Sequence, residues 1–302
     1  MLNSNNLKFL KIGRKFILNF RKIYYSNKMN QFIEKDQIKY YDILRPKYTQ
    51  EIFHDIISST KQYDNYLDIA CGTGQLLIPL AKSFKRVTGL DVSPAQIEKA
   101  KENIEKLPEE YDKTKFNLLV SDIYDLNKKL EESISFDLIT IGQAFHWFDE
   151  VKLLNYLKTI LKDEGILILA GYKKQHFVQE EQPELYDMLQ NVLNKLIPYF
   201  ECDVDNNDNA YYKSMENIKN IFDDKKILKK YYQESSEISV DKLFDFLRSF
   251  SAFINYKRIN NSEDILEDFS KELRKYYRVG TEEELKQIKI KFNNFYFVIS
   301  IQ

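Results

Sequence analysis

A glycine turn between an apolar strand and a helix is the feature that most constrains this chain. The turn follows residues 66–69, Tyr-Leu-Asp-Ile, and contains Gly72 and Gly74. Because glycine has no Cβ, backbone N–H groups in such a turn can approach a ligand closely. The next apolar strand, residues 86–91, ends in Asp91, where a carboxylate can accept hydrogen bonds from a ribose diol. Together the two segments predict a nucleoside-cofactor site.

The residues around the turn distinguish between two nucleoside cofactors. A dinucleotide fingerprint has a third glycine beside the pyrophosphate, but here Gly74 is followed by Gln75 and two leucines. Asp68, ahead of the turn, would repel a pyrophosphate but suits a cation. S-adenosylmethionine carries both a sulfonium and an α-ammonium group. The electrostatics therefore favour this cofactor over a nicotinamide dinucleotide, and a generic α/β turn with incidental acids is the alternative.

These segments resemble the motifs of class I S-adenosylmethionine-dependent methyltransferases. Four stretches match the family's motifs in order: residues 67–74, 89–93, 120–123 and 136–148. Ala70 stands where the first motif often has a glycine. The string Gln-Ala-Phe-His-Trp-Phe at 143–148, with residues 41–46, is similar to the small-molecule branch that includes trans-aconitate methyltransferases.

The resemblance implies an α/β fold: a Rossmann-like, seven-stranded, mostly parallel sheet with helices on both faces, an antiparallel last strand and a helical lid insertion in the C-terminal half. Strands alternating with helices indicate the same parallel sheet. Expected strands are 66–69, 86–91, 116–120, 137–141, 166–170, 227–233 and 295–301. Expected helices are 47–60, 75–84, 93–107, 150–161, 184–197, 240–250, 265–277 and 282–288, with a polar loop at 203–209.

The first 33 residues differ in composition from the rest. They carry Lys and Arg between apolar residues, and no acid occurs before Glu34. This pattern is typical of a mitochondrial transit peptide, and a basic leading helix is the alternative. We expect residues 34–302 to form the methyltransferase domain, with a mostly helical lid or substrate region within 173–290. The location is then the mitochondrial matrix or the cytoplasm.

Composition limits the expected partners. The 45 basic and 46 acidic residues nearly cancel, which gives no global field for nucleic acid. No apolar run approaches the roughly 20 residues of a transmembrane helix. Cys71 and Cys202 are far apart, and with scattered histidines they give no metal-ligand spacing. We expect a small-molecule substrate and no metal, while membership of a large complex stays open.

By resemblance, cofactor-binding residues lie at the strand ends. Asp68 would hold the ammonium group or cap the following helix, Asp91 would accept from both ribose hydroxyls, and Asp122 would accept from the adenine N6 amino group. The remaining expected contacts are Ala70, Gly72 and Gly74 in the turn, Leu90 and Ile123 on the adenine faces, Ser93 and Gln96 beside the adenosine, Gln143, and Tyr41 and Arg45 at the methionine end. Ser93 is equally a helix N-cap, and Arg45 a surface salt bridge.

The candidate catalytic residues Gln143, His146 and Trp147 follow the fourth strand, at the edge where open α/β sheets bind ligands. His146 is either a general base or a structural hydrogen-bonding group of the loop. Trp147 either walls the pocket or fixes the loop. A carboxylate acceptor has no proton to lose, so the protein would then contribute mainly alignment.

The sequence thus predicts a methyltransferase that uses S-adenosylmethionine and a small-molecule acceptor, with a carboxylate as the expected acceptor. One alternative is a quinone- or lipid-intermediate methyltransferase in mitochondria. Another is a catalytically silent scaffold subunit of a larger complex, because a fold does not fix a function. A nucleic-acid or protein methyltransferase is disfavoured by the near-neutral charge.

Overall fold

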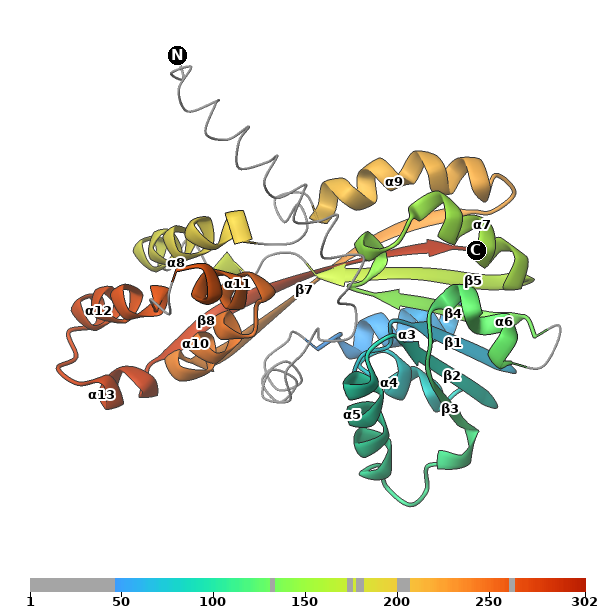
Figure 1. The fold of residues 1–302 in the computed structure, drawn as a ribbon, viewed down its shortest axis with the longest axis horizontal. Helices are drawn as coiled ribbons and strands as arrows, with labels where there is room; N and C mark the ends of the chain where they lie inside the picture. Colours follow the sequence, from blue (N-terminus) through green and yellow to red (C-terminus); the bar gives the residue numbers. More distant parts are fainter. Residues whose placement is uncertain (1–46, 131–133, 173–175, 178–181, 200–206, 261–263) are drawn as a thin grey trace, which may run out of the picture.

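The computed structural model describes residues 47–130, 134–172, 176–177, 182–199, 207–260 and 264–302. They form one eight-stranded sheet with the order β3-β2-β1-β4-β5-β8-β6, and β7 pairs with β8 (Figure 1). Five strands are parallel: β1 (Asn65–Ile69), β2 (Arg86–Asp91), β3 (Phe116–Val120), β4 (Phe136–Gly142) and β5 (Leu161–Tyr172). The antiparallel pairs involve β6 (His176–Phe177), β7 (Ile227–Ser239) and β8 (Lys289–Ile301).

Helices cover both faces of the parallel part of the sheet, because its strands are apolar on both sides. One face packs against α3 (Gln50–Ser59), α4 (Leu77–Ala81) and α5 (Pro94–Glu105). The other packs against α6 (Leu126–Lys129), α7 (Glu150–Ile160) and α9 (Asn207–Ile221) (Figure 1). On β1, Tyr66 faces the first group, and Leu67 faces the second.

A second group of helices has a core of its own around the outer halves of β7 and β8 (Figure 1). This helical cluster consists of α8 (Pro183–Leu196), α10 (Val240–Arg248), α11 (Ser251–Ile259), α12 (Ile265–Tyr277) and α13 (Glu282–Gln287). Ile290 of β8 belongs to its core, whereas Tyr296 and Val298 further along β8 belong to the core beneath α3. One strand therefore joins the sheet to the helical cluster.

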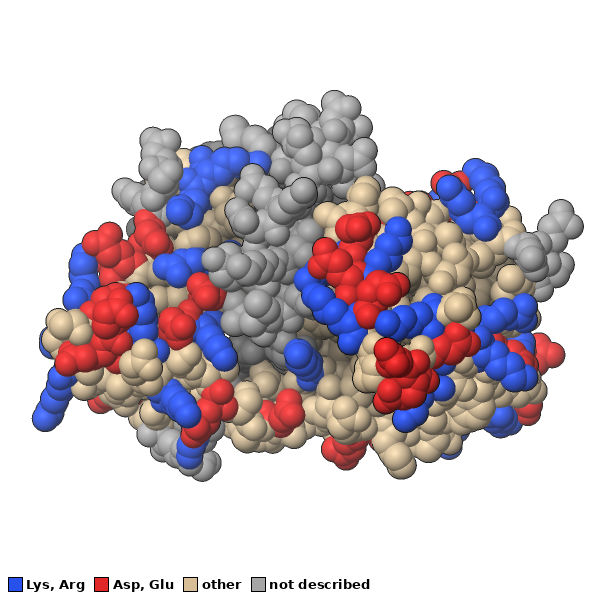
Figure 2. Space-filling view, turned by 90° about the horizontal axis from the view of Figure 1, so that it is seen from below, with Lys and Arg blue, Asp and Glu red and all other residues tan. Residues whose placement is uncertain are grey.

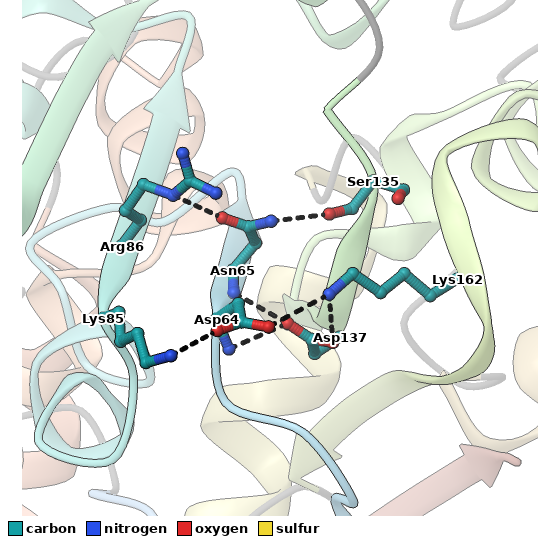
Figure 3. A network of polar contacts seen from close by, with 7 residues as sticks. All are labelled: Asp64, Asn65, Lys85, Arg86, Ser135, Asp137 and Lys162. Atoms are coloured by element: carbon teal, nitrogen blue, oxygen red, sulfur yellow. Dashed lines mark hydrogen bonds and ion pairs between the residues drawn. The ribbon is translucent and has the colours of Figure 1, made fainter.

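The amino-terminal edge of the sheet is tied together by a polar network (Figure 3). Buried Asp137 on β4 accepts from the backbone N–H groups of Asp64 and Asn65 at 2.9 and 2.7 Å, and Lys162 on β5 lies 2.6 Å from its other oxygen. Asn65 Oδ1 accepts from Arg86 Nε of β2 at 2.8 Å. This network joins the starts of four strands, opposite the edge that carries the expected site.

The predicted Rossmann-like architecture is confirmed: a mostly parallel sheet, flanked by helices, with an antiparallel strand at the C-terminal end. The strand count is eight rather than seven because of the two-residue β6. The predicted strand at 227–233 is the first half of β7, and the predicted strand at 295–301 is the second half of β8. The predicted polar loop at 203–209 overlaps the start of α9, and neither α9 nor α11 was predicted. In the described part of the chain, no helix is both long and apolar enough to cross a bilayer.

Candidate cofactor and active site

The glycine turn after β1 is built from left-handed residues. Ala70, Gly72 and Gly74 have φ values of 53°, 54° and 96°. Cys71 N–H donates to Leu90 O at 3.0 Å, and a Cβ on Gly74 would lie 2.8 Å from Ile78 Cδ1. The N–H groups of residues 71, 72 and 74 all donate within the protein, so these hydrogen bonds fix the shape of the turn. Ala70 adopts the conformation that favours glycine, which explains why a glycine is frequent there in the motif.

Asp91 joins this turn to the next one. Its Oδ2 accepts from Gly72 N–H at 3.0 Å, and its Oδ1 accepts from Ser93 N–H at 2.9 Å. Burial raises the pKa of Asp91, and these backbone hydrogen bonds oppose that rise. A carboxylate offers about four acceptor positions, so the pair of oxygens can also accept from a ligand's hydroxyls. The predicted neighbours Gly72, Asp91 and Ser93 therefore lie together.

Two glutamines beside the turn have buried polar atoms without a hydrogen-bond partner. Gln96 Oε1 lies 3.8 Å from the position of a Cβ on Gly72, and neither it nor Gln75 Nε2 has a partner among the described residues. Ser93 caps α5 by accepting from Gln96 N–H, which confirms the N-cap interpretation, while its contact with the adenosine stays a prediction. A buried acceptor and a buried donor without partners are costly unless a ligand satisfies them. The donor set thus fits a polar nucleoside, and Gln75 was missed from the sequence.

Asp68 lies beneath the turn rather than in it. It is 2% exposed, and its Oδ1 accepts from Thr140 Oγ1 at 2.5 Å. The backbone N–H of Leu77, at the start of α4, also donates to it. Burial raises the pKa of Asp68 to about 7, and the nearby Asp91 adds to the rise. Asp68 thus caps α4, as one of the two interpretations expected, and it is placed below the turn that the ammonium group would approach.

The residues expected to contact the adenine differ in how far they are exposed. Asp122 is exposed and caps the 3-10 helix η3 (Ile123–Asp125) by accepting from Tyr124 N–H at 3.0 Å. Leu90 and Ile123 belong to the core that faces α7, with 2% and 1% of their surfaces exposed. Neighbouring side chains cover both residues in this conformation, and their packing on the adenine faces stays a prediction.

Exposed valines lie where those core residues were expected. Val92 follows the last residue of β2, Val120 ends β3, and both are exposed. The register pairs Asp91 with Val120, so the two strand ends are adjacent.

The loop after β4 starts with a second left-handed residue. Gln143 has a φ of 54°, its N–H donates to Ala170 O at 2.9 Å, and its Nε2 donates to Tyr172 O at 2.9 Å. The side chain therefore fastens the loop to the end of β5. Non-glycine residues with positive φ are strained, and strain of this kind is concentrated at functional sites. Ala70 and Gln143 both lie at the carboxyl edge of central strands.

His146 and Trp147 lie in the 3-10 helix η4 (Phe145–Trp147), just before α7. Their rings are 5.0 Å apart, and Trp147 is 43% exposed. Burial lowers the pKa of His146 to about 4, so the ring is neutral at pH 7. Its Nδ1 is buried and has no hydrogen-bond partner in the described part of the chain. A neutral imidazole with an unoccupied nitrogen can hydrogen-bond a ligand but is a weak base.

Several predicted elements lie outside the described residues: Tyr41, Arg45, Cys202 and the basic segment 1–33. Within the described residues, no group of three or more His, Cys, Asp or Glu side chains has the arrangement of a metal site. On the face drawn in Figure 2, cations and anions of the described residues are interspersed, with no broad patch of one sign. That face offers no electrostatic footprint for nucleic acid.

Comparisons with known proteins agree with this geometry. Residues 60–234 match the model of a family described as a methyltransferase domain. A Dictyostelium discoideum protein that carries the name methyltransferase is 36% identical over 135 residues, 44% of this chain and 46% of that protein. A malonyl-[acyl-carrier protein] O-methyltransferase of Ilyobacter polytropus is 31% identical over 141 residues, 45% of this chain and 48% of that enzyme. The matched region thus spans about half the length of these relatives.

A solved structure shows the same fold over most of the chain. It belongs to a protein of Anaeromyxobacter dehalogenans described as a type II methyltransferase, with a TM-score of 0.63 and 17% identity. The similarity covers 85% of this chain and 97% of that one. Since the family model covers more than half of the sequence, and the glycine turn and strand-end acids fall inside it, the chain belongs to the class I S-adenosylmethionine-dependent methyltransferases.

Proposed function

We propose that this protein transfers a methyl group from S-adenosylmethionine to a carboxylate oxygen of a small acceptor. The observation that carries the cofactor site is the Asp91 carboxylate, which holds the glycine turn through Gly72 and the start of α5 through Ser93. The unpartnered Gln75 and Gln96 beside this turn supply a donor and an acceptor for the nucleoside. When bound, S-adenosylmethionine supplies a methyl group on an electrophilic sulfonium sulfur.

The chemistry around His146 favours an acceptor that arrives without a proton to lose. Its pKa of about 4 makes it a poor base at neutral pH, whereas efficient general bases have a pKa near the working pH. A carboxylate acceptor needs no base, so alignment for in-line attack and exclusion of water are sufficient. The similarity to malonyl-[acyl-carrier protein] O-methyltransferases, which by their name methylate an oxygen, supports the same acceptor class.

The adenine is proposed to lie against Val92 and Val120 rather than Leu90 and Ile123. Both valines are exposed apolar side chains at adjacent strand ends, beside Asp91 and Asp122. Val92→Asp would place a charge against the ring, so it should weaken binding of S-adenosylmethionine and of free adenosine alike. Unchanged affinity for both ligands would remove Val92 from the site.

The experiment that tests the function is calorimetric titration of the full chain with S-adenosylmethionine, with NAD as the control. We expect micromolar binding of the first alone, about −8 kcal/mol. Methyl transfer is then measured with labelled cofactor and two acceptor panels, small carboxylic acids and isoprenoid phenols. Transfer only to the phenols would replace our acceptor with a quinone or lipid intermediate. Binding without any transfer, and co-migration with a large complex, would instead indicate a scaffold subunit.

A mitochondrial matrix location is proposed on the composition of residues 1–33 alone. Their Lys, Arg and apolar residues, without an acid, are typical of a transit peptide. A fluorescent fusion of the full chain should enter mitochondria, and a matched fusion that starts at Met29 should stay outside. The same distribution for both fusions would contradict this location.

A further inference from the structure

A chain of three buried hydrogen-bonding side chains lies beneath the cofactor turn. Tyr66 and Asp68 are on β1, and Thr140 is on β4, where the register pairs it directly with Asp68. Thr140 Oγ1 lies 2.5 Å from Asp68 Oδ1 and 2.8 Å from Tyr66 Oη. Tyr66 and Thr140 are completely buried, and Asp68 nearly so. None of these contacts was foreseen, because a single threonine in an apolar strand gives no signal in the sequence.

The direction of these hydrogen bonds is fixed by the number of protons available. A threonine hydroxyl has one proton, and here it is donated to Asp68. Thr140 Oγ1 must therefore accept from Tyr66, whose phenol keeps its proton because burial raises its pKa far above the ordinary value. Asp68 thus receives two donors, Thr140 from the side and Leu77 N–H from α4. Donors favour the ionised carboxylate, whereas burial favours the neutral acid.

Among the described residues around Asp68 there is no cation that would favour the ionised carboxylate over the neutral acid. The titratable groups facing it are Tyr66 on β1, Cys71 in the turn, Asp91 on β2 and, behind Tyr66, Tyr48 ahead of α3. The residues of α4, Leu-Ile-Pro-Leu-Ala, include no titratable side chain. Burial raises the pKa of the Cys71 thiol, so the thiol stays neutral. Among the described residues, the charge that acts on Asp68 is therefore the negative charge of Asp91, which opposes ionisation.

We propose that Thr140, supported by Tyr66, is a positioning residue that holds Asp68 in the orientation and the ionised form required by the cofactor's ammonium group. This inference rests on the proposed cofactor site. A protonated Asp68 has no charge to offer, so a cation that binds above the turn must displace its proton to solvent. Binding is then coupled to the release of one proton, and the Thr140 hydrogen bond lowers the cost of that release.

The test is the pH dependence of affinity for S-adenosylhomocysteine, which has the ammonium group but no reactive methyl group. With a pKa of about 7 for Asp68, wild-type affinity should be about tenfold weaker at pH 6 than for the fully ionised site. Thr140→Val removes the donor but keeps the shape, so it should shift this dependence to higher pH and weaken binding about tenfold at pH 7. Measurements stay below about pH 7.5, where the ligand's α-amino group is still protonated.

Three controls separate positioning from general damage. Thr140→Ser keeps the hydroxyl and should restore the wild-type profile. Thr88→Val, at a buried threonine on β2, should leave the profile unchanged. Methylthioadenosine lacks the amino-acid group, so Thr140→Val should bind it as the wild type does.

The possible outcomes are distinct. Equal weakening of both ligands by Thr140→Val, or an unshifted pH profile, would overturn the role of Thr140. Wild-type protein that binds neither ligand would overturn the proposed function itself. Calorimetric titration in buffers of different ionisation heats provides a second readout, since it counts the protons released. Release of no protons at pH 6 by the wild type would also contradict the inference.

Discussion

Asp91 holds two turns with one carboxylate, so its replacement should act on the cofactor site directly. Asp91→Ala removes the acceptor of Gly72 N–H and Ser93 N–H and the proposed partner of the ribose diol. A hydrogen bond to a charged group contributes about 1.5–3 kcal/mol, so affinity for S-adenosylmethionine should fall at least tenfold. Calorimetry measures this, with Asp112→Ala, an exposed capping aspartate beyond α5, as the matched control. Unchanged affinity would refute the ribose assignment.

The lowered pKa of His146 predicts how turnover depends on pH. Because burial lowers its pKa to about 4, it is unprotonated throughout pH 5–8. The rate profile should therefore have no limb near pH 6.5 from this residue. His146→Ala should lower turnover and spare cofactor binding, whereas His54→Ala, at an exposed histidine of α3, should change neither. Full turnover in His146→Ala would favour the structural interpretation of this side chain.

At the scale of elements, Asp137 holds together the starts of β1, β4 and β5. Asp137→Ala leaves two backbone N–H groups at the start of β1 without their acceptor, and it removes the nearer and buried partner of Lys162, which keeps Asp64 at 3.6 Å. Breaking a buried pair from one side typically costs about 3–5 kcal/mol, so the free energy of unfolding in urea should fall by that order. Lys61→Ala, which removes the exposed pair with Glu164, should cost less than about 1 kcal/mol.

The position of Asp137 adds a second readout. It lies at the edge opposite the glycine turn, so the folded variant should bind S-adenosylmethionine as the wild type does. A loss of affinity under conditions where the variant is folded would show that the two edges are coupled.

The sequence predicted the elements whose signals are local. β2 and β3 have the predicted bounds because turn residues flank their apolar runs, and Ser93 with Pro94 marks the start of α5. The helix α9 was not predicted, because the Asn and Asp residues at its start favour turns in isolation, and tertiary packing against α7 overrides that preference. Partners far apart in sequence, such as Asp68 and Thr140, could not be read from either segment alone.

At the scale of the whole molecule, Asp68 should make stability fall as pH rises. Its folded pKa of about 7 lies above the ordinary value of 3.8, so the folded state binds the proton more tightly than the unfolded chain. The contribution of Asp68 to the free energy of unfolding is most favourable below about pH 4. It declines between about pH 4 and 7 and is constant above about pH 7. The full difference is about 4 kcal/mol, and the raised pKa of Asp91 adds in the same direction.

Asp68→Asn tests this contribution. The amide cannot ionise, so the variant should exceed the wild type in stability at pH 8 and lose most of that advantage at pH 4, as measured by urea unfolding. The same variant should bind S-adenosylmethionine weakly, because stability is given up for a functional carboxylate. A variant that is less stable than the wild type at pH 8 would mean that the donors of Thr140 and Leu77 outweigh the cost of burial.

The place of β8 between β5 and β7 has a consequence for how the protein is made. On the ribosome, β1 to β5 emerge in order and can pair at once, and they carry the glycine turn and both strand-end acids. β6 and then β7 emerge, but both pair with β8, which follows about 50 residues after the end of β7. The strands that carry the cofactor turn are therefore made well before β8 completes the cores on both of their faces, and the interval before β8 arrives is when an exposed β7 needs protection from aggregation.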